Sequence, residues 1–575
     1  MSKLMSNHLN ICRKLNKADK VLKNASIINV FSKEIIKGDI AIANGKVIGI
    51  GKYEGIEEID LKGKYVAPGF IDSHVHIEST MVSPREFASV VMPFGTTTII
   101  ADPHEIANVA GLKGVEYMIR ESEHACIHIY YMLPSCVPCS NMETSGAILD
   151  AEKLQSMIDD PKILGLGEVM NYPGVILGDT GVLDKLEISQ GKVIDGHAPG
   201  LGGYDLMAYV LAGIQTDHEC STLEETLERI RLGMIVQIRK GSAADNLEDI
   251  VKGMIKAGYS FERCVFCTDD KHLDHIMENG HINSNIRESI ALGVDPIEAI
   301  AMATLYPAKF YGLNKKGAIA PGYDADLVVF DSLEKIDVES VMIDGMWKCR
   351  EGVPTETLKT QHNRYSAGLE ILNTVNCEDV TEEDLRIDLI HPLATVMGLM
   401  PKQIITRKLR EDVPVVDGTF VANEIYSKIV VVERYQASGN IGKGIVKGFD
   451  IKGGAIAQTI AHDSHNIICI GDNDRDMVLA INYIKEKQGG IVVVKNGVVI
   501  GELHLPLGGL MSTLSAKEVT GQLNKLITIA YGLGINKEVD PFLTLAFLAL
   551  PVIPEIKITD KGLFDVGQFK HISIN

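Results

Sequence analysis

Long apolar segments are absent from this sequence. The apolar run near its C-terminus, "PFLTLAFLALPVIP", is too short to span a bilayer and is interrupted by Pro551. The first twenty residues hold no continuous apolar stretch of the kind that a secretory signal needs. The ten cysteines are scattered rather than gathered in a small disulfide framework, which is typical of a reducing compartment. We therefore expect a cytoplasmic protein with no membrane partner.

Positive charge is also in short supply. The chain has 56 Lys and Arg residues against 76 Asp and Glu residues, and its formal net charge is −20. This charge opposes binding to a polyphosphate backbone, so we expect no nucleic-acid partner. At 575 residues and 46% hydrophobic content, the chain suits a compact globular protein of two or three domains.

Short apolar runs recur from residue 65 onward, separated by stretches with helical character. The eight runs are "YVAPGFID", "GTTTIIAD", "CIHIYYML", "ILGLGE", "KVIDGH", "AGIQTDH", "GMIVQIRKG" and "CVFCTDD". Eight alternations of strand and helix over about 250 residues are typical of a (β/α)8 barrel of the TIM type, in which active-site groups lie at the C-terminal ends of the strands. We therefore predict an α/β fold with this barrel at residues 65–316.

Polar residues gather at the ends of these runs. His74 and His76 end the first run one residue apart, so both imidazoles would point to the same side of a strand. The other run ends hold Asp102, His104, Glu168, His197, His218, Arg239, Lys240, Asp269 and Asp270. A His-x-His pair alone is a weak signal, but so many converging polar groups would lack partners without a metal centre.

The expected centre has histidine and carboxylate ligands. Four histidines with bridging oxygen ligands suit a pair of divalent ions such as zinc, iron or manganese, and the absence of cysteine argues against a structural zinc site. Two ions can share a hydroxide and lower its pKa towards neutrality. The sequence therefore predicts a hydrolytic site with a metal-activated nucleophile.

Ten motifs of the chain, in order, closely resemble the adenine deaminases of the amidohydrolase superfamily. They are "PGFIDSHVHIES", "GTTTIIADPHE", "GLGEVMN", "DGHAPGL", "DHE", "TDDKHLDHIMENGHIN", "MATLYPAKFYGL", "GAIAPGYDADLVVF", "GGAIAQTIAHDSHNIICIGDND" and "LPLGGLMS". This resemblance covers nearly the whole chain. It implies hydrolytic deamination of adenine to hypoxanthine and ammonia on two divalent ions, with Mn²⁺ or Fe²⁺ expected ahead of Zn²⁺. We also expect a homo-oligomer, a dimer or a tetramer.

The resemblance also implies which residues hold the metals and carry the reaction. The implied ligands are His74, His76, Glu168, His197, His218 and Asp269. His74 and His76 would hold the first ion, and His197 and His218 would hold the second. Glu168 would bridge the ions in place of the carboxylated lysine of many relatives, and Asp269 would bind the first ion and shuttle the proton. At Tyr435 the chain departs from the family pattern, in which a histidine is expected after the arginine.

Further polar residues near the strand ends are candidates to contact the purine or to orient a ligand. They are Glu78, Asp102, His104, Glu105, Arg239, Lys240 and Ser242. Glu78, Asp102, His104 and Glu105 lie close to the strands that carry the expected metal ligands. Support of a metal ligand, or capping of a helix, explains each of these four residues equally well. Spacing alone assigns no role to any of them.

Two further domains flank the predicted barrel. Residues 18–64 and 317–375 have the short strands and Asn-Gly turns of a β structure, and in amidohydrolases two such segments form one discontinuous β-sandwich. From residue 385 the chain is again glycine-rich and β-prone, so we expect an additional α+β domain at 385–575. The histidine-rich positions of this domain are His462, Asp463, His465 and His504; they allow a second metal site, although such histidines are more often hydrogen-bonded core or loop residues.

Three other interpretations compete with this one. "HIE" followed by "PSCVPC" resembles the zinc nucleobase deaminase signature, but its proline is displaced by one residue, and we interpret Cys136 and Cys139 as loop cysteines. Cyclic amide hydrolysis, as in dihydroorotases and hydantoinases, normally uses a modified lysine where this chain has Glu168. A scaffold that has lost its metals would be expected to have lost some of the ligands as well.

Overall fold

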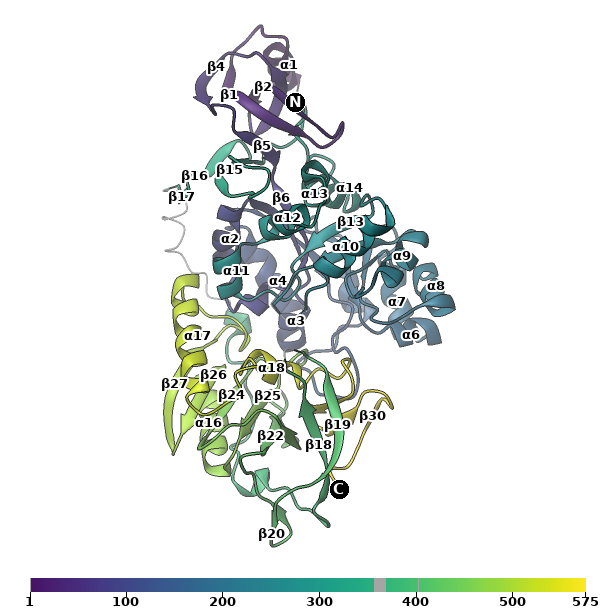
Figure 1. The fold of residues 1–575 in the computed structure, drawn as a ribbon, viewed down its shortest axis with the longest axis vertical. Helices are drawn as coiled ribbons and strands as arrows, with labels where there is room; N and C mark the ends of the chain where they lie inside the picture. Colours follow the sequence, from purple (N-terminus) through teal and green to yellow (C-terminus); the bar gives the residue numbers. More distant parts are fainter. Residues whose placement is uncertain (1, 243, 356–368, 402) are drawn as a thin grey trace.

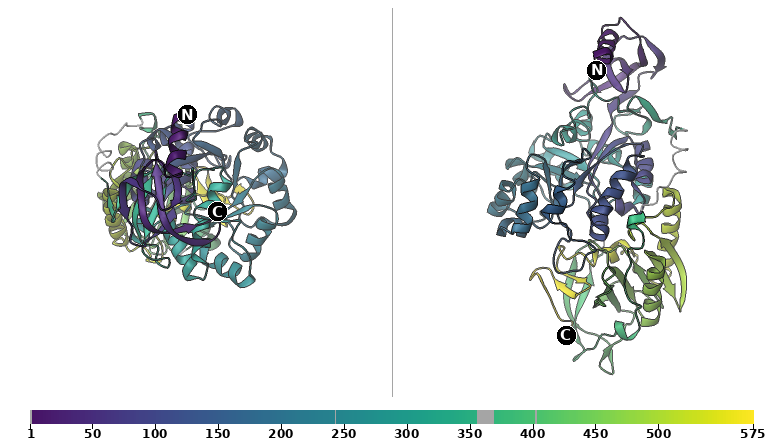
Figure 2. Two further views of the ribbon diagram at one scale, coloured as in Figure 1. Left: turned by 90° about the horizontal axis from the view of Figure 1, so that it is seen from above. Right: turned by 180° about the vertical axis from the view of Figure 1, so that it is seen from behind.

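The computed structural model describes residues 2–242, 244–355, 369–401 and 403–575. Three parts follow one another along the long axis of the molecule (Figure 1). A sheet of N-terminal strands lies at one end, strands surrounded by helices occupy the middle, and a second sheet with its helices lies at the other end, as the view from behind in Figure 2 also shows. Residues 356–368, which belong to the segment expected at 317–375, lie outside the described residues.

The first part is a nine-stranded sheet made from two segments that are far apart in the sequence. β5 joins them, because it pairs in parallel with β1 and antiparallel with β14. Ile27 and Leu327, one from each segment, are buried in the same core. Helix α1 (Ser2–Cys12) precedes the sheet. The strands are β1 (Ala18–Asn29), β2 (Glu34–Ala43), β3 (Lys46–Gly51), β4 (Gly55–Asp60), β5 (Tyr65–Pro68), β14 (Leu327–Phe330), β15 (Val338–Ile343), β16 (Met346–Arg350) and β17 (Val353–Pro354).

The middle part contains eight parallel strands, five in one sheet and three in another. Hydrogen bonds link the two sheets at both seams: Gln215 N donates to Ile194 O at 2.9 Å, and Asp269 N donates to His74 O at 3.0 Å. β6, β7 and β13 are buried along their whole length, as parallel strands covered on both faces should be. The strands are β6 (Phe70–Val75), β7 (Thr96–Ala101), β8 (His128–Leu133), β9 (Ile163–Val169), β10 (Val193–Gly196), β11 (Thr216–Asp217), β12 (Ile235–Arg239) and β13 (Cys264–Cys267).

Each of the eight apolar runs contains one of these strands, but the first run divides between two sheets. Its beginning is β5 of the N-terminal sheet and its end is the start of β6, with Gly69 between them. A Cβ at Gly69 would lie 2.1 Å from Oγ1 of Thr97, so only glycine fits where the chain passes from one sheet to the next.

Helices follow the central strands and cover them from outside (Figures 1 and 2). Several begin at side-chain caps: the hydroxyl of Thr222 accepts from Glu225 N while the Glu225 carboxylate accepts from Thr222 N, a complete capping box. The helices are α2 (Pro84–Val91), α3 (His104–Ala110), α4 (Leu112–Ser122), α5 (Ala151–Gln155), α6 (Tyr172–Leu177), α7 (Thr180–Ile188), α8 (Gly203–Leu211), α9 (Leu223–Arg231), α10 (Leu247–Ala257), α11 (Leu273–Asn279), α12 (Ile282–Ala291), α13 (Pro296–Met302) and α14 (Leu305–Phe310), with 3-10 turns η1 (Ile77–Thr80), η2 (Met92–Phe94), η3 (Leu369–Ile371) and η4 (Glu383–Leu385).

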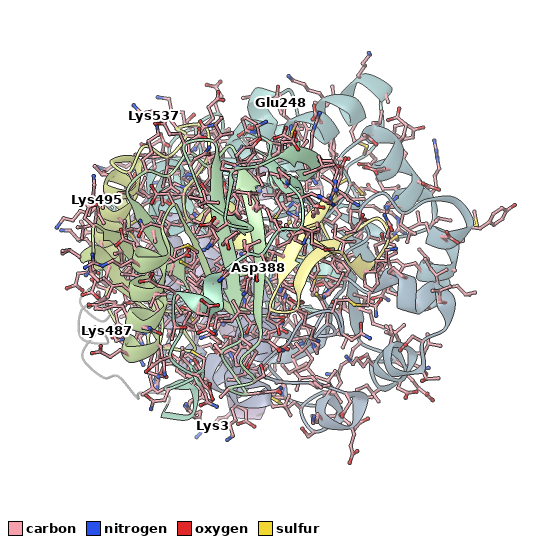
Figure 3. All side chains as sticks on the ribbon, turned by 90° about the horizontal axis from the view of Figure 1, so that it is seen from below. Lys3, Glu248, Asp388, Lys487, Lys495 and Lys537 are labelled. Atoms are coloured by element: carbon pink, nitrogen blue, oxygen red, sulfur yellow. The ribbon has the colours of Figure 1, made fainter. Side chains whose placement is uncertain are left out.

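The third part, called here the C-terminal part (residues 393–575), contains an eight-stranded sheet. Alternate residues of β26 face opposite sides: Val492 and Val494 join the core under α16, and Ile491 and Val493 join the core that includes α17. In Figure 3 this part is seen from below, with Lys487 and Lys495 pointing outward at its edge. Its elements are β18 (Leu393–Leu399), β19 (Thr406–Asp412), β20 (Val415–Val416), β21 (Thr419–Phe420), β22 (Tyr426–Val432), β23 (Ile441–Lys447), β24 (Gly454–Gln458), β25 (Ile467–Gly471), α16 (Asp474–Lys487), β26 (Gly490–Lys495), β27 (Val498–His504), α17 (Ala516–Tyr531), α18 (Leu543–Phe547), β28 (Ile556–Thr559), β29 (Gly562–Asp565) and β30 (Lys570–His571).

The C-terminal part docks directly on the loops that follow the central strands. Ser512 N donates to Met81 O at 2.8 Å, Thr144 N donates to a carboxylate oxygen of Asp560 at 2.9 Å, and the amide of Asn466 donates to Thr144 O at 2.8 Å. These bonds place C-terminal residues over the ends of the central strands. Among the described residues, helices long and apolar enough to cross a membrane are not found.

Candidate metal centre and substrate cavity

His74 and His76 project from the end of β6 toward one point. Their Nε2 atoms are 3.2 Å apart, and both side chains are buried. Nδ1 of His76 lies 2.9 Å from the carbonyl oxygen of Asp102. Because a carbonyl can only accept, this nitrogen carries the proton, and Nε2 presents its lone pair toward His74. Two ring nitrogens so close to each other are arranged to share a cation.

The carboxylate of Glu168, at the end of β9, lies between two pairs of histidines. Its Oε1 is 3.3 Å from Nε2 of His76, while its Oε2 is 2.8 Å from Nδ1 of His197 and 3.3 Å from Nε2 of His218. Burial alone would raise the pKa of the Glu168 carboxyl, but hydrogen bonds from His197 and His218 hold that pKa well below its usual value. An ionised carboxylate with one oxygen toward each pair can bridge two cations.

Asp102 fixes the position of Glu168. Its Oδ2 accepts from the backbone N–H of Glu168 at 2.9 Å. This bond requires the glycine of "GLGE", since a Cβ at Gly167 would lie 2.2 Å from the same oxygen. Asp102 therefore orients Glu168 through its carboxylate and His76 through its carbonyl.

The second pair of histidines has a carboxylate partner that sequence analysis missed. Nδ1 of His197 and Nε2 of His218 are 3.2 Å apart, and Oε1 of Glu219 lies 3.6 Å and 3.5 Å from them. The only sequence signal for Glu219 is its place next to His218 in "DHE". In a strand, adjacent residues point to opposite sides, so a place next to His218 would argue against a shared site. However, β11 ends at Asp217, before both residues, and both side chains can therefore face the centre.

Asp269 follows β13 and faces the first histidine pair. Its Oδ1 is 3.1 Å from Nε2 of His76 and 3.6 Å from Nε2 of His74. Its Oδ2 accepts from Nη1 of Arg239 at 2.7 Å, and the same guanidinium contacts both oxygens of Glu219, at 2.5 Å and 3.2 Å. Burial alone would raise the pKa of Asp269, but Arg239 and the histidines hold this pKa well below its usual value. Arg239 thus orients two carboxylates of the centre.

The donor set fits a pair of divalent ions. The six residues expected to hold metals lie in one cluster, in which His197 is half-buried and the other five are buried. The ligand atoms of His74, His76 and Asp269 lie within 4.8 Å of one another, as do those of His197, His218 and Glu219. Nitrogen and oxygen donors of this kind suit manganese, iron or zinc. Cys136 and Cys139 lie in the loop after β8, where Cys139 Sγ donates to Glu143, and burial raises the pKa of both thiols.

A cavity of about 320 Å³ opens over this centre. Its floor includes His76, Glu168, His197, His218 and Asp269. Its roof comes from the C-terminal part and is mainly apolar, formed by Ile404, Ile405, Phe547, Leu550, Val552, Ile553 and Pro554. A small, largely apolar space with a few polar groups is typical of a binding site for a flat small molecule.

The remaining candidate residues differ in their distance from this cavity. His104 lines it, with Nδ1 3.4 Å from Oε1 of Glu168. Glu78 is buried behind the floor, where Oε1 accepts from Ile106 N at 3.2 Å, and burial together with the Glu105 charge raises the pKa of Glu78 to about 7. Ser242 and Lys240 are not among the described residues that line the cavity; Ser242 contacts His275, and Lys240 pairs with Asp245 and Glu288.

His462 and Asp463 of the C-terminal part reach the same cavity. Nδ1 of His462 lies 2.9 Å from Oε1 of Glu105, and Oδ1 of Asp463 lies 3.8 Å from Nε2 of His104. His465 lies behind them, and its Nδ1 accepts from Ala461 N at 3.2 Å. Sequence analysis considered these residues only as a separate site or as core histidines, because no local pattern shows that a loop near residue 462 meets helix α3.

Known proteins similar to this chain identify its family. A family model described as "Amidohydrolase family" matches residues 65–348, and one described as "Adenine deaminase C-terminal domain" matches residues 403–570. A protein of Clostridium acetobutylicum named "Adenine deaminase" is 48% identical, over 97% of this chain and 98% of that protein. The chain belongs to the adenine deaminase family. The "Adenine deaminase" of Geobacillus kaustophilus is 44% identical over 100% of both chains.

Membership in the adenine deaminase family confirms the resemblance found in the motifs. The fold is accordingly of the mixed α/β kind found in amidohydrolases. A solved structure entitled "Crystal structure of an adenine deaminase" aligns with a TM-score of 0.45 at 18% identity, over 58% of this chain and 99% of that chain. Membership also removes the support for a cyclic amide hydrolase of the dihydroorotase type.

Proposed function

We propose that this protein catalyses the hydrolytic deamination of adenine to hypoxanthine and ammonia on a pair of divalent metal ions. The observation that carries the proposal is the Glu168 carboxylate, which has one oxygen toward His76 and the other toward His197 and His218, at the floor of a cavity of about 320 Å³. The names of the relatives in Clostridium acetobutylicum and Geobacillus kaustophilus support adenine as the substrate.

We assign the metal ligands from these distances. His74, His76 and Asp269 would hold the first ion, His197 and His218 would hold the second, and Glu168 would bridge them. Mn²⁺ or Fe²⁺ is proposed ahead of Zn²⁺ because of the family resemblance; the imidazole and carboxylate donors suit all three metals. When bound, such a pair supplies a nucleophilic hydroxide at neutral pH.

Asp269 is proposed to move the proton in this reaction. One water adds to C6 of adenine, its proton passes to the carboxylate of Asp269, and the exocyclic nitrogen takes a proton and leaves as ammonia. Arg239 holds Oδ2 of Asp269 at 2.7 Å, so the carboxylate keeps a fixed direction toward the histidine pair. The apolar roof, including Phe547 and Leu550, excludes bulk water from the ring.

We also propose how the three parts are organised and where the protein acts. The bonds between the two central sheets support one closed (β/α)8 barrel at residues 65–316. The flanking parts would be a discontinuous β-sandwich at 18–64 and 317–375, and an α+β domain at 385–575. We further propose a cytoplasmic homo-oligomer, dimer or tetramer, without nucleic-acid or membrane partners, in accordance with the net charge of −20.

Ammonia release tests the proposed function. Full-length protein loaded with Mn²⁺ or Fe²⁺ is expected to release ammonia from adenine, and little or none from adenosine, AMP or cytosine, because a ribose on N9 would clash with the cavity wall or leave polar groups unpaired. Comparable rates on adenosine and adenine would refute the free-base assignment. Hydrolysis of a dihydropyrimidine without deamination of adenine would move the protein to the amide-hydrolysing branch.

A further inference from the structure

The roof of the cavity contains a buried carboxylate, one oxygen of which has no hydrogen-bond donor among the described residues. Asp463 is 3% exposed and lines the cavity. Among the described residues, its Oδ2 has no hydrogen-bond partner. Its Oδ1 lies 3.8 Å from Nε2 of His104 and 3.9 Å from Nδ1 of His462, both beyond the usual N–H···O range of about 3.2 Å. A buried carboxylate left in this condition is costly, so a donor from a bound molecule would stabilise it.

The loop that carries Asp463 is held rigidly in place. The guanidinium of Arg434 donates to the carbonyl of His465, the hydroxyl of Tyr435 donates to the carbonyl of Ser464, and the side chain of Asn466 accepts from Arg434 N at 3.2 Å. Tyr435 is the position at which the chain departs from the family pattern, and its role is therefore to brace this loop. A braced loop keeps Asp463 fixed over the cavity when no substrate is present.

The imidazoles beside Asp463 do not hydrogen-bond to it. Nδ1 of His462 lies 2.9 Å from Oε1 of Glu105, and Nε2 of His104 is 3.8 Å from Oδ1 of Asp463. Oδ2 of Asp463 has no hydrogen-bond partner among the described residues, so the carboxylate can accept a donor from the cavity. The other side of the cavity is the floor that carries the candidate metal ligands. If the protein deaminates adenine as proposed, the reacting amine must lie at this floor.

We propose that Asp463 is a specificity-determining residue that accepts the imidazole-ring N–H of the purine, an inference that rests on the proposed function. Neutral adenine has two kinds of N–H donor, the exocyclic amine and one imidazole nitrogen. The amine is placed at the floor by the chemistry, so the ring N–H is the donor that can reach the roof. A nucleoside lacks this N–H, and its binding would leave a buried carboxylate unpaired.

Matched pairs of ring analogues test this contact. 4-Aminopyrrolo[2,3-d]pyrimidine and 4-aminofuro[2,3-d]pyrimidine differ only in N–H against O at the position of N9, and the [3,2-d] isomers form the same pair at the position of N7. Inhibition constants against adenine deamination, and calorimetric titration of the metal-loaded full chain, give an affinity ratio for each pair. The wild type is expected to favour the N–H member of one pair by about 10- to 100-fold, as for a hydrogen bond to a charged group.

Substitution of Asp463 should abolish this preference. Asp463→Leu keeps a side chain of similar shape without an acceptor, and its ratio should fall to about 1; Asp463→Asn, which keeps a neutral acceptor, should give an intermediate ratio and a raised KM for adenine with a smaller change in kcat. Asp476→Asn is the control, because Asp476 is an equally buried aspartate of the same part that accepts from Gly497 N at 2.6 Å and does not line the cavity. Its ratio should equal that of the wild type.

The outcomes separate this inference from the proposed function. If the wild type releases no ammonia from adenine, the proposed function is wrong, whatever the analogues show. If adenine is deaminated but the N–H and O analogues bind equally well to the wild type, or both Asp463 variants keep its ratio, the inference about Asp463 is wrong. If Asp463→Leu lost its fold, its affinity for both members of a pair would fall alike. The affinity ratio measured with Asp463→Asn would then decide the question.

Discussion

Replacement of Asp269 by asparagine should separate metal binding from proton transfer. Oδ1 of Asp269 faces the histidine pair at 3.1 Å and 3.6 Å, while Oδ2 accepts from Nη1 of Arg239 at 2.7 Å. Asparagine has one oxygen for these two tasks, and its amide nitrogen cannot accept from a guanidinium. With a cation bound, the oxygen should turn toward the cation, and the amide nitrogen should then face Arg239.

The cost of this rearrangement sets the expected change in metal affinity. Arg239 keeps its two contacts to Glu219, at 2.5 Å and 3.2 Å, so it is not left without a partner. The lost charge-assisted bond is worth about 1.5–3 kcal/mol, which corresponds to a loss of about 10- to 100-fold in affinity for the first ion. The lost proton carrier should lower turnover by about 10² or more even when metal is saturating.

Two measurements separate these effects. Metal content after equilibration in a series of metal buffers gives the affinity for each ion, and ammonia release from adenine at saturating metal gives the turnover. Arg239→Lys is a useful comparison, because it leaves the Asp269 carboxylate intact while removing the forked contact to two carboxylates. Near-normal turnover of Asp269→Asn at saturating metal would exclude Asp269 from proton transfer, and unchanged metal affinity would refute the argument from Arg239.

Three further predictions concern ligands, pH and stability. His74→Ala should lower bound metal and turnover together, while Glu168→Ala should affect both ions; metal analysis and ammonia release check this, and full metal with full activity in either variant would disprove the assignment. Burial raises the pKa of Glu143 to about 8 from its ordinary value of 4.5, so its contribution to stability is present below pH 4.5 and is lost as pH rises through about 8. Urea unfolding should therefore show a flatter pH dependence over that window for Glu143→Gln, and an unchanged slope would contradict the shift. Thr222→Ala removes the capping box of α9 and should lower the free energy of unfolding by about 1 kcal/mol, whereas an effect near zero would show that the Glu225 contact adds nothing.

The central strands and their polar ends could be predicted from the sequence because both depend on local pattern. Buried parallel strands must be nearly continuous apolar runs, and parallel neighbours bring their C-terminal ends to one edge. His74 lies two residues beyond the first run, and Glu168 and His218 are the last residues of the fourth and sixth runs, so their convergence follows from the strands alone. The division of the first run at Gly69 could not be predicted in this way, because a single apolar run gives no sign that it serves two sheets.

The places of Glu219 and Asp463 in the site could not be predicted from local sequence pattern. Glu219 follows His218 directly, and the alternation of a strand would turn it away; β11 is only two residues long and ends before both. Asp463 is separated from His104 by hundreds of residues, and only the packing of the C-terminal part brings the two together. Such contacts depend on how two folded surfaces meet, which hydrophobic periodicity does not encode.

The floor and the roof of the cavity come from different parts of the chain, so the cavity forms only where these two parts dock. The floor residues lie between positions 76 and 269, and the apolar roof residues lie between positions 404 and 554. Bonds from Ser512 to Met81 and from Asn466 to Thr144 fix one against the other. Without the roof, the metal ligands would face bulk water, in which an added hydrogen bond or charge contact is worth much less than in a closed site. Under the proposed function, the C-terminal part is therefore expected to create the environment in which Glu168, Asp269 and Asp463 would act on one small ring.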